Sequence, residues 1–406
     1  MPRTYTTLDA ARDLDNIARM IALAFGGTPE GARDWLTNAG VDNLRVVQDE
    51  GRAVASLLRI PMGAYFGGRS VPLLGIAGVA VAPEERGLGH AAFLMHNLVR
   101  SAFEEGWALA GLYASTHRLY RKFGFEHAGH RFQYTVPLVR IDAGGPLSAV
   151  STLPGELRIV ALQESDDPEI RACYQNFARM YEGTLDRGPY IWSRIRKQRE
   201  ETYTGFGVRE AAGSLRGYLF MSQQRSNPLG RFSVALSDFV FTDEAAGRRL
   251  WEFLHDFSMM GENLTFCGGP SHPALQLLRQ QRHKVELKDD WLIRVIDFKR
   301  AIESRAYSPA INTELRLELN DDTIPENSGR WLIRIADGRA SAARDHSAAE
   351  SSTVLRLSAR AIATLYSGFN TAHQARLLGL ADGDDTTLSL ADSIFARSTP
   401  WMSDMY

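Results

Sequence analysis

Residues 78–92 read GVAVAPEERGLGHAA and predict a strand, a tight turn and the start of a helix. Gly87 and Gly89 in the turn allow backbone angles that other residues avoid, and they let a ligand approach the main chain closely. Successive amide groups at a helix start, with the helix dipole behind them, form a binding site for an anion. Arg86 can add a charge-assisted contact. The stretch therefore predicts a turn that binds pyrophosphate.

Two other phosphate-binding patterns do not fit this turn. A dinucleotide-binding fold requires Gly-x-Gly-x-x-Gly after the first strand and an acidic residue about 20 residues further on. Here the turn follows a later predicted strand. A P-loop requires Gly-Lys-Ser/Thr, which the turn lacks. On the two glycines alone, an ordinary strand-to-helix turn is an equally good interpretation.

The sequence around this turn predicts a mixed α/β domain. The hydrophobic pattern gives two helices and five strands, in the order helix 14–24, strands 43–47, 53–62 and 71–81, helix 90–103, strands 109–114 and 132–139. A linker rich in turn-forming residues follows at 142–148. A similar order of elements then recurs and ends in a strand at 291–296. The remaining residues predict an α+β domain, so a tandem duplication followed by a third domain is expected.

The composition is that of an ordinary globular protein. The chain has 406 residues, 44% of them hydrophobic, and a formal net charge of −2, which argues against duplex nucleic acid as the main partner. Two cysteines, Cys173 and Cys267, exclude a disulfide scaffold and a Cys-rich zinc site. His90 and His96 are expected on a helix surface rather than on a metal. With no signal peptide and no apolar stretch long enough for a bilayer, we expect a cytoplasmic protein without a membrane partner.

A second informative segment, residues 112–125, reads LYASTHRLYRKFGF and predicts a strand followed by a short helix. Tyr120 lies in that helix. A phenol, with a pKa of about 10, can hydrogen-bond a departing thiolate, whose thiol has a pKa of about 8.5, and can donate a proton to it. The alternative is that Tyr120 and Phe123 only pack the helix against the sheet.

Together, these two segments resemble the GNAT superfamily of acetyl-CoA-dependent N-acetyltransferases. The pyrophosphate signature of that family, Arg/Gln-x-x-Gly-x-Gly/Ala, matches Arg86, Gly89 and Ala91. In the family, the strand before the turn splays from its neighbour and pairs with the pantetheine chain. The resemblance implies acetyl-CoA as cofactor, with contacts from Val79, Ala80, Val81, Arg86, Gly87, Leu88, Gly89, His90 and Ala91.

The length and the order of domains resemble more specifically the enhanced intracellular survival (Eis) family. The resemblance implies a catalytic GNAT domain at 1–143, a degenerate GNAT-like domain at 150–298 and a sterol-carrier-protein-like domain at 299–406. It also implies a coenzyme contact at Ser115, an acid role for Tyr120 and a homohexamer. The expected fold class is α/β (α+β), with mixed central sheets flanked by helices in both GNAT-like domains.

In the Eis family the chain ends in an aromatic residue whose carboxylate reaches the active site, and this chain ends in Tyr406. The hypothesis that follows is that the Tyr406 α-carboxylate accepts a proton from the attacking amine, directly or through water. Its reference pKa of about 3.3–3.7 keeps it ionised at neutral pH. A frayed tail is the alternative. Trp401, Met402 and Tyr406 are unusually apolar for a free tail, which favours docking.

The acceptor pocket is predicted from position. Phe25 and Trp35 lie near the first helices, where GNAT folds contact the acceptor, and Asp34, Asp404 and the chain end could add negative charge. An acidic pocket with aromatic walls suits polycationic amines. The resemblance implies primary amines of aminoglycosides, lysine side chains or polyamines as acceptors, attacked directly in a ternary complex. The alternative function is an acyl-CoA-binding sensor or a lipid carrier without transferase activity.

The second domain is predicted to bind no coenzyme. If Gly247 is aligned with Gly89, Glu244 takes the place of Arg86 and Arg249 that of Ala91. A carboxylate repels a pyrophosphate and a bulky side chain fills the anion site. This domain is then expected to wall off the acceptor cleft and to carry the third domain.

Overall fold

The computed structural model describes residues 3–142, 157–225, 230–347 and 354–406. Apart from Asp142, the predicted linker lies outside these residues, and so do the predicted domain edges at 143 and 150. Among the described residues, no helix is long and apolar enough to cross a membrane.

The first half of the molecule contains every element predicted around the turn and the short helix predicted at Tyr120, which is α4, together with strand β1 and helix α2, which were not predicted. Its elements are β1 (Thr4–Thr7), α1 (Ala10–Phe25), α2 (Pro29–Ala39), β2 (Leu44–Asp49), β3 (Arg52–Phe66), β4 (Arg69–Val81), α3 (His90–Glu104), β5 (Leu109–Tyr113), α4 (His117–Arg121) and β6 (Glu126–Pro137). The β2–β3 hairpin turns at Glu50 and Gly51, both with positive φ, as a tight hairpin requires.

The second half repeats this order of elements. They are β7 (Arg158–Ala161), α5 (Asp167–Ala178), β8 (Leu185–Asp186), α6 (Pro189–Arg196), β9 (Lys197–Gln198), β10 (Glu201–Thr202), β11 (Thr204–Arg209), β12 (Leu215–Arg225), β13 (Phe232–Phe241), α7 (Glu244–His255), β14 (Gly261–Gly268), α8 (Pro273–Gln276) and β15 (Lys284–Val295). The strands predicted at 132–139 and 291–296 both begin earlier than expected. The first residues of β6, Glu126–Arg131, contain no large apolar side chain, and the first residues of β15 are exposed, so the hydrophobic pattern does not extend over them.

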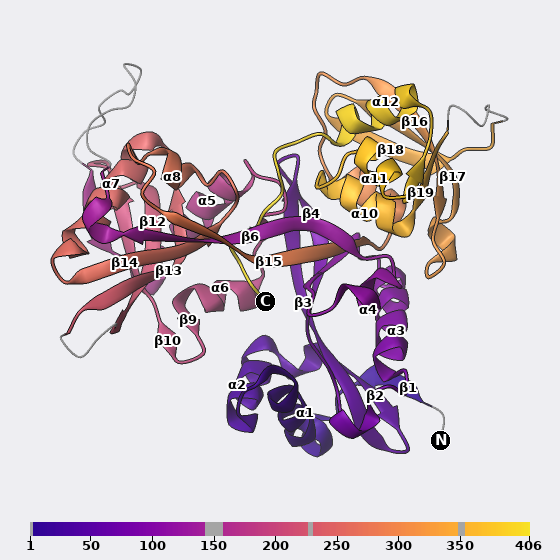
Figure 1. The fold of residues 1–406 in the computed structure, drawn as a ribbon, viewed down its shortest axis with the longest axis horizontal. Helices are drawn as coiled ribbons and strands as arrows, with labels where there is room; N and C mark the ends of the chain where they lie inside the picture. Colours follow the sequence, from indigo (N-terminus) through magenta and orange to yellow (C-terminus); the bar gives the residue numbers. More distant parts are fainter. Residues whose placement is uncertain (1–2, 143–156, 226–229, 348–353) are drawn as a thin grey trace.

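The two halves share one 13-stranded sheet because they exchange their last strands. Strand β6 of the first half pairs with β14 of the second half, whereas β15 of the second half pairs with β5 of the first. Strands β6 and β15 also pair with each other, and Figure 1 shows them crossing the middle of the molecule. The sequence predicts strands here but not their partners.

In each half, two parallel strands pair briefly and then part. Strands β4 and β5 pair from Leu73↔Leu109 to Ile76↔Leu112, after which β4 continues to Val81 beside β3 alone. We call this divergence the first notch. In the second half, β13 and β14 pair up to Ala235↔Thr265, and β13 then continues to Phe241 beside β12. We call this divergence the second notch.

The third domain is a five-stranded sheet with helices, at the upper right of Figure 1. Its elements are α9 (Phe298–Ser304), β16 (Thr313–Asn320), β17 (Gly329–Ala336), β18 (Arg339–Arg344), β19 (Leu355–Ser358), α10 (Ala359–Ser367), α11 (Ala372–Leu377), β20 (Ala381–Asp382) and α12 (Asp385–Phe395). Helix α10 packs on β6 and β15, where Arg360 forms an ion pair with the buried Glu126 at 2.5 Å. The third domain therefore rests on the exchanged strands.

The C-terminal segment returns from α12 to the centre of the molecule, where Figure 1 marks the chain end. The Trp401 amide donates a hydrogen bond to the Glu182 carbonyl at 3.0 Å, and Trp401 and Met402 are buried. Tyr406 is only 8% exposed. The segment is therefore docked, and the frayed-tail alternative is wrong.

Candidate active site

The turn between β4 and α3 offers free backbone amides. Gly87 and Gly89 have φ of 83° and 87°, which glycine adopts without strain. No side chain caps the start of α3, so the amides of its first turn are left for a ligand. A Cβ built at Gly87 would meet nothing within 4 Å, and Arg86 and Leu88 beside it are exposed. This open, uncapped turn fits a pyrophosphate group.

His90 differs from the expectation of a helix-surface position. Its side chain is buried, with Nε2 3.3 Å from the Glu85 carboxylate, because this face of α3 turns towards the protein. The imidazole is therefore directed away from the open side of the turn. What His90 can present to a ligand is its backbone amide at the first position of α3, followed by that of Ala91.

The edge of β4 at the first notch carries unpaired backbone groups. Gly78 has φ of 57°, and the β3–β4 register shifts between Ser56 and Leu58, which marks a bulge. The Ala82 amide donates to the Val54 carbonyl of β3 at 2.9 Å. Because such bonds alternate along an antiparallel pair, Val79 and Val81 direct their backbone groups the other way, towards the notch. The neighbouring Ala80 is buried.

The Trp35 ring packs against this bulge at Gly78. A Cβ at Gly78 would lie 2.7 Å from the Trp35 ring, so only glycine fits beneath it. The indole Nε1 donates a hydrogen bond to the Tyr190 hydroxyl of α6 at 2.6 Å, which ties the first half to the second. Phe25, by contrast, is 58% exposed at the end of α1, and no described contact joins it to Trp35.

Tyr120 lies on α4, beside the end of β5. It is 5% exposed and packs against Phe125, with ring centroids 6.1 Å apart. Burial raises the pKa of the phenol to about 12, and a hydrogen bond with the Ser115 side chain offsets only part of that effect. The phenol therefore keeps its proton at physiological pH. Ser115 itself is exposed, two residues beyond Tyr113, the last residue of β5.

Tyr406 lies over the last residue pair but one before the first notch. Gly75 and Gly111 are partners across the parallel β4–β5 pair. A Cβ at Gly75 would stand 3.1 Å from Cε2 of Tyr406, and a Cβ at Gly111 would stand 3.0 Å from its hydroxyl oxygen. The ring also packs against Tyr113 at 5.5 Å between centroids. Two glycines thus make room for the last residue of the chain.

Tyr120 and Tyr406 lie on opposite faces of the sheet. Tyr120 belongs to the apolar cluster that contains α3 and Leu74 of β4. Tyr406 belongs to the cluster that contains α1 and Leu73. Since successive residues of a strand point to opposite faces, these clusters lie on either side of β4. Strands β4 and β5 part beyond Ile76 and Leu112, so the first notch lies between the faces that carry Tyr120 and Tyr406.

Asp404 does not contribute the free negative charge that was expected at the acceptor site. Its carboxylate is buried and forms an ion pair with Arg187 at 3.0 Å. Arg187 also binds Asp238 at 2.6 Å. The sequence could not show this pairing, because it joins residues that lie far apart in the chain. Asp34 is exposed, as expected for a surface acid.

In the second half, the turn that corresponds to the pyrophosphate turn is closed. The Asp243 carboxylate caps α7 by accepting a hydrogen bond from the Ala246 amide at 3.0 Å. The alignment of Gly247 with Gly89 is wrong, because Gly247 lies inside α7 and a Cβ there would stand 2.5 Å from Leu277. The Asp243 carboxylate thus occupies the place that an anion would take. That this half binds no coenzyme stays a prediction, and its reason is now Asp243 rather than Glu244 and Arg249.

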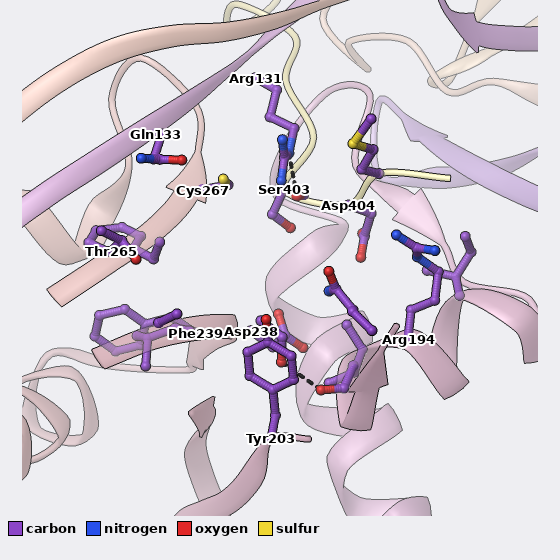
Figure 2. Close-up of a pocket in the computed structure, with 18 of the residues that line it drawn as sticks. Arg131, Gln133, Arg194, Tyr203, Asp238, Phe239, Thr265, Cys267, Ser403 and Asp404 are labelled. Carbon is purple, nitrogen blue, oxygen red and sulfur yellow. Dashed lines mark hydrogen bonds between the residues drawn. The ribbon is translucent and has the colours of Figure 1, made fainter. Parts of the chain in front are cut away.

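A pocket at the second notch was missed by sequence reasoning. This cavity has a volume of about 200 Å³. Figure 2 shows Asp238 and Phe239 of β13, Cys267 of β14, and Ser403 and Asp404 of the C-terminal segment around it. The signal in the sequence was Asp238, a carboxylate within an otherwise apolar strand, which requires a buried partner.

One cluster of side chains has the composition of a metal site. Donor atoms of His117, His127 and Asp290 lie within 4.8 Å of one another. The Arg121 guanidinium lies 3.3 Å from Nδ1 of His127 and supplies a positive charge at this place, and Asp290 also binds His130 at 2.6 Å. These contacts form a junction that ties α4 to β6 and β15.

Three family matches divide the chain. Residues 7–128 and residues 183–295 each match an acetyltransferase (GNAT) domain, and residues 298–403 match a sterol carrier protein domain. The N-acetyltransferase Eis of Mycobacterium bovis is 27% identical over 392 residues, which are 92% of this chain and 91% of the relative. An uncharacterized N-acetyltransferase of Streptomyces griseus is 26% identical over 428 residues, covering 100% of this chain and 99% of the relative.

Solved structures agree over the full length. A GCN5-related N-acetyltransferase from Anabaena variabilis superposes with a TM-score of 0.90 at 26% identity, covering 100% of both chains. Eis1 from Mycobacterium abscessus has the same fold, with a TM-score of 0.77 at 18% identity and 100% coverage of both chains. The chain is therefore an Eis-like GNAT acetyltransferase with a C-terminal sterol-carrier-protein-like domain, and acetyl-CoA is its acetyl donor. This finding supports the transferase and not the alternative of a sensor or carrier without activity.

Proposed function

We propose that the enzyme transfers the acetyl group directly to a primary amine within a ternary complex at the first notch. The observation that carries this proposal is the position of Tyr120 and Tyr406 on opposite faces of the sheet beside the uncapped start of α3. Residues 1–143 would form the catalytic domain, with 150–298 and 299–406 as the second and third domains.

The described residues fit the coenzyme. Arg86 and the amides of residues 87–91 would hold the pyrophosphate, and the free backbone edge of Val79 and Val81 would hold the pantetheine chain. Ser115 would contact the coenzyme near Tyr120. When bound, acetyl-CoA supplies the acetyl group as a thioester. The buried Ala80 keeps water from the inner side of that edge.

Tyr120 is the proposed proton donor to the sulfur that leaves. A phenol with a pKa of about 12 is a weaker acid than a thiol in water, whose pKa is about 8.5. Burial also destabilises a thiolate and raises its affinity for a proton, so the pKa values of the thiol and the phenol are closer together inside the notch than in water. Tyr120 therefore acts first as a hydrogen-bond donor and releases its proton as charge develops on the sulfur.

The Tyr406 α-carboxylate is the proposed acceptor of the proton from the attacking amine. The ring position over Gly75 and Gly111 brings this end of the chain to the first notch. A carboxylate with a reference pKa of about 3.3–3.7 is a weak base, so it acts through water and also stabilises the ammonium that forms. The proton lost by nitrogen thus leaves on the face opposite to Tyr120.

Direct transfer is supported by where the two cysteines lie. Cys173 is buried in α5, and its burial raises the pKa of the thiol to about 12. Cys267 lies at the second notch, where burial also raises its pKa. Neither thiol lies at the first notch, and a raised pKa leaves a thiol unreactive. An acetylated cysteine is therefore not needed in the proposed reaction.

The acceptor is proposed to be a cationic primary amine of the aminoglycoside, lysine or polyamine type. The aromatic ring of Trp35 lies against the bulge of β4, and Phe25 exposes its ring at the end of α1. Aromatic faces and a nearby carboxylate attract cations. These features support an amine acceptor without selecting one.

We further propose a homohexamer that works in the cytoplasm. Large apolar side chains such as Val285, Leu287, Leu377 and Leu378 are exposed, and an assembly would cover surfaces of this kind. Both cysteines are free, which suits a reducing compartment. Light scattering coupled to size-exclusion chromatography measures the assembly, and a monomer at micromolar concentration would contradict it.

The experiment that tests the proposed function is acetyl-CoA-dependent thiol release against a panel of aminoglycosides, polyamines and lysine peptides. Release that requires an amine, with the acetylated amine found by mass spectrometry, supports the proposal. Thiol release without any amine product, or tight binding of acetyl-CoA with no turnover on any amine, would contradict it.

A further inference from the structure

Arg187 is buried between the second half and the C-terminal segment. Its side chain is 0% exposed. Its terminal nitrogens bind the Asp238 carboxylate at 2.6 and 3.0 Å, and its Nε donates to the Asp404 carboxylate at 3.1 Å. The guanidinium also lies over the Tyr174 ring, 3.6 Å from the centroid. One buried cation therefore joins two buried carboxylates.

Of these two carboxylates, Asp238 belongs to the framework and Asp404 to the tail. Asp238 lies on β13 at the second notch and also accepts a hydrogen bond from the Tyr218 hydroxyl at 2.7 Å. Asp404 is two residues from the end of the chain. Its burial raises the pKa of the carboxyl, and Arg187 opposes that effect. Without the guanidinium, a charged Asp404 would not stay in this place.

The rest of the C-terminal segment also lines the second notch. Trp401 packs over Gly269, where a side chain would collide with the indole. Arg131 of β6 donates from Nε to the Ser403 carbonyl at 2.9 Å, and the Tyr113 hydroxyl donates to the Asp404 carbonyl. Figure 2 shows Arg131, Ser403 and Asp404 around this pocket. The second notch thus holds a segment of the chain itself beside its cavity.

The distance from this anchor to the first notch is short. Only Met405 separates Asp404 from Tyr406, and Met405 is 44% exposed. Two residues span at most about 7 Å even when fully extended. A fixed Asp404 therefore confines Tyr406 to the neighbourhood of Gly75 and Gly111.

We propose that Arg187 is a positioning residue for acetyl transfer, which clamps the C-terminal segment in the second notch through Asp404 and so holds Tyr406 at the first notch. The degenerate half contributes to the reaction by this clamp. The inference rests on the proposed role of Tyr406, but the anchoring itself is measured separately from activity.

The test combines two variants with a readout of the tail. Asp404→Asn removes the charge and leaves the Arg187–Asp238 pair neutral and intact, so this variant should fold. Arg187→Met breaks both contacts. Release of Tyr406 by carboxypeptidase reports whether the chain end is held, and kcat and the dissociation constant of acetyl-CoA are measured in parallel. We expect release at least tenfold faster in both variants, kcat at least tenfold lower, and acetyl-CoA binding within twofold of the unmodified enzyme.

The matched control is Arg294→Met. Arg294 is equally buried and pairs with Asp321, but it does not touch the C-terminal segment. This control should lower the melting temperature without speeding the release of Tyr406, which separates anchoring from general loss of stability. Release at the unmodified rate in Asp404→Asn and Arg187→Met would overturn the clamp, whatever their kcat. Faster release with unchanged kcat would uphold the clamp as an anchor, remove its role in transfer, and count against Tyr406 in the proposed function.

Discussion

Gly111 lies directly beneath the phenol of Tyr406, so that a Cβ at Gly111 would stand 3.0 Å from the Tyr406 hydroxyl oxygen. This contact joins the last residue of the chain to strand β5, which lies between β4 and β15 in the sheet. It also explains why a residue with no side chain occupies a buried strand position, where glycine is otherwise unfavourable.

The first prediction concerns this contact. Gly111→Ala should displace the Tyr406 ring, because the added methyl group would also stand 3.2 Å from Leu73. A displacement of about 1 Å at a catalytic group can lower kcat by about a hundredfold. Steady-state kinetics should therefore show a lower kcat with unchanged affinity for acetyl-CoA. Gly383→Ala, with only an ordinary 3.4 Å contact in the third domain, is the control, and equal kcat in both variants would count against the contact.

The second prediction concerns Tyr120. Tyr120→Phe keeps the buried ring and removes the proton donor, so kcat should fall by about 10²–10⁴-fold while acetyl-CoA still binds. Because the phenol has a pKa of about 12, it stays protonated below that pH, and no alkaline loss of activity from Tyr120 is expected below about pH 10. A pH–rate profile checks the second point.

The control for Tyr120→Phe is Tyr307→Phe. Tyr307 is a buried phenol in the third domain, and its hydroxyl donates to the Ile302 carbonyl at 2.9 Å. This variant should retain its turnover. If Tyr120→Phe also retained full turnover, Tyr120 would be a packing residue only.

The third prediction concerns the pyrophosphate turn. Arg86→Glu replaces an exposed cation by an anion beside the amides of the first turn of α3. Loss of a charge-assisted hydrogen bond costs about 1.5–3 kcal/mol, so the dissociation constant of acetyl-CoA should rise by about 10–100-fold in calorimetry. Arg339→Glu, an exposed position in the third domain, should leave it unchanged. Equal affinity in the two variants would remove Arg86 from the coenzyme site.

The fourth prediction concerns His272, which packs near the C-terminal segment, and the loss of folding stability at acid pH. Burial lowers the pKa of His272 to about 3, and its ring packs near Trp401. The unfolded chain takes up a proton at this side chain below about pH 6.5, whereas the folded chain does not until about pH 3. The contribution of His272 to the free energy of unfolding is therefore complete above about pH 6.5 and falls by about 1.4 kcal/mol per pH unit below it.

Melting temperatures at pH 7 and pH 5 check this sign. The fall on acidification should be smaller in His272→Gln than in the unmodified enzyme. The exposed His346→Gln in the third domain should show the full fall. An identical acid response in all three proteins would show that His272 is not the group responsible.

The sequence predicted the local elements around the candidate site, because turns and short helices depend on local chemistry. The glycines of the turn, the helix that follows and the buried Tyr120 were all visible as short patterns. The strand exchange of β6 and β15 was not visible, because a hydrophobic pattern predicts a strand without its partner. The length of both strands was also underestimated, because the start of β6 has no large apolar side chain and the start of β15 is exposed.

The contacts of the C-terminal segment were the least visible. Arg187 lies 51 residues from Asp238 and 217 residues from Asp404, so no local spacing indicates that they meet. The sequence analysis predicted that Asp404 is a free charge for the acceptor, because its position near the end of the chain gave no sign of burial. The docking of Trp401 and Tyr406, by contrast, followed from their apolar character.

The most direct test of the account is the effect of a short C-terminal extension on turnover. A Gly-Ser dipeptide added after Tyr406 moves the carboxylate away from the first notch and leaves the pyrophosphate turn untouched. Thiol release is measured with a saturating amine, beside an equal extension at the N-terminus as control. We expect kcat to fall by about 10²-fold or more with the C-terminal extension while acetyl-CoA binds as before. Unchanged kcat in the extended chain would contradict the role of the Tyr406 carboxylate.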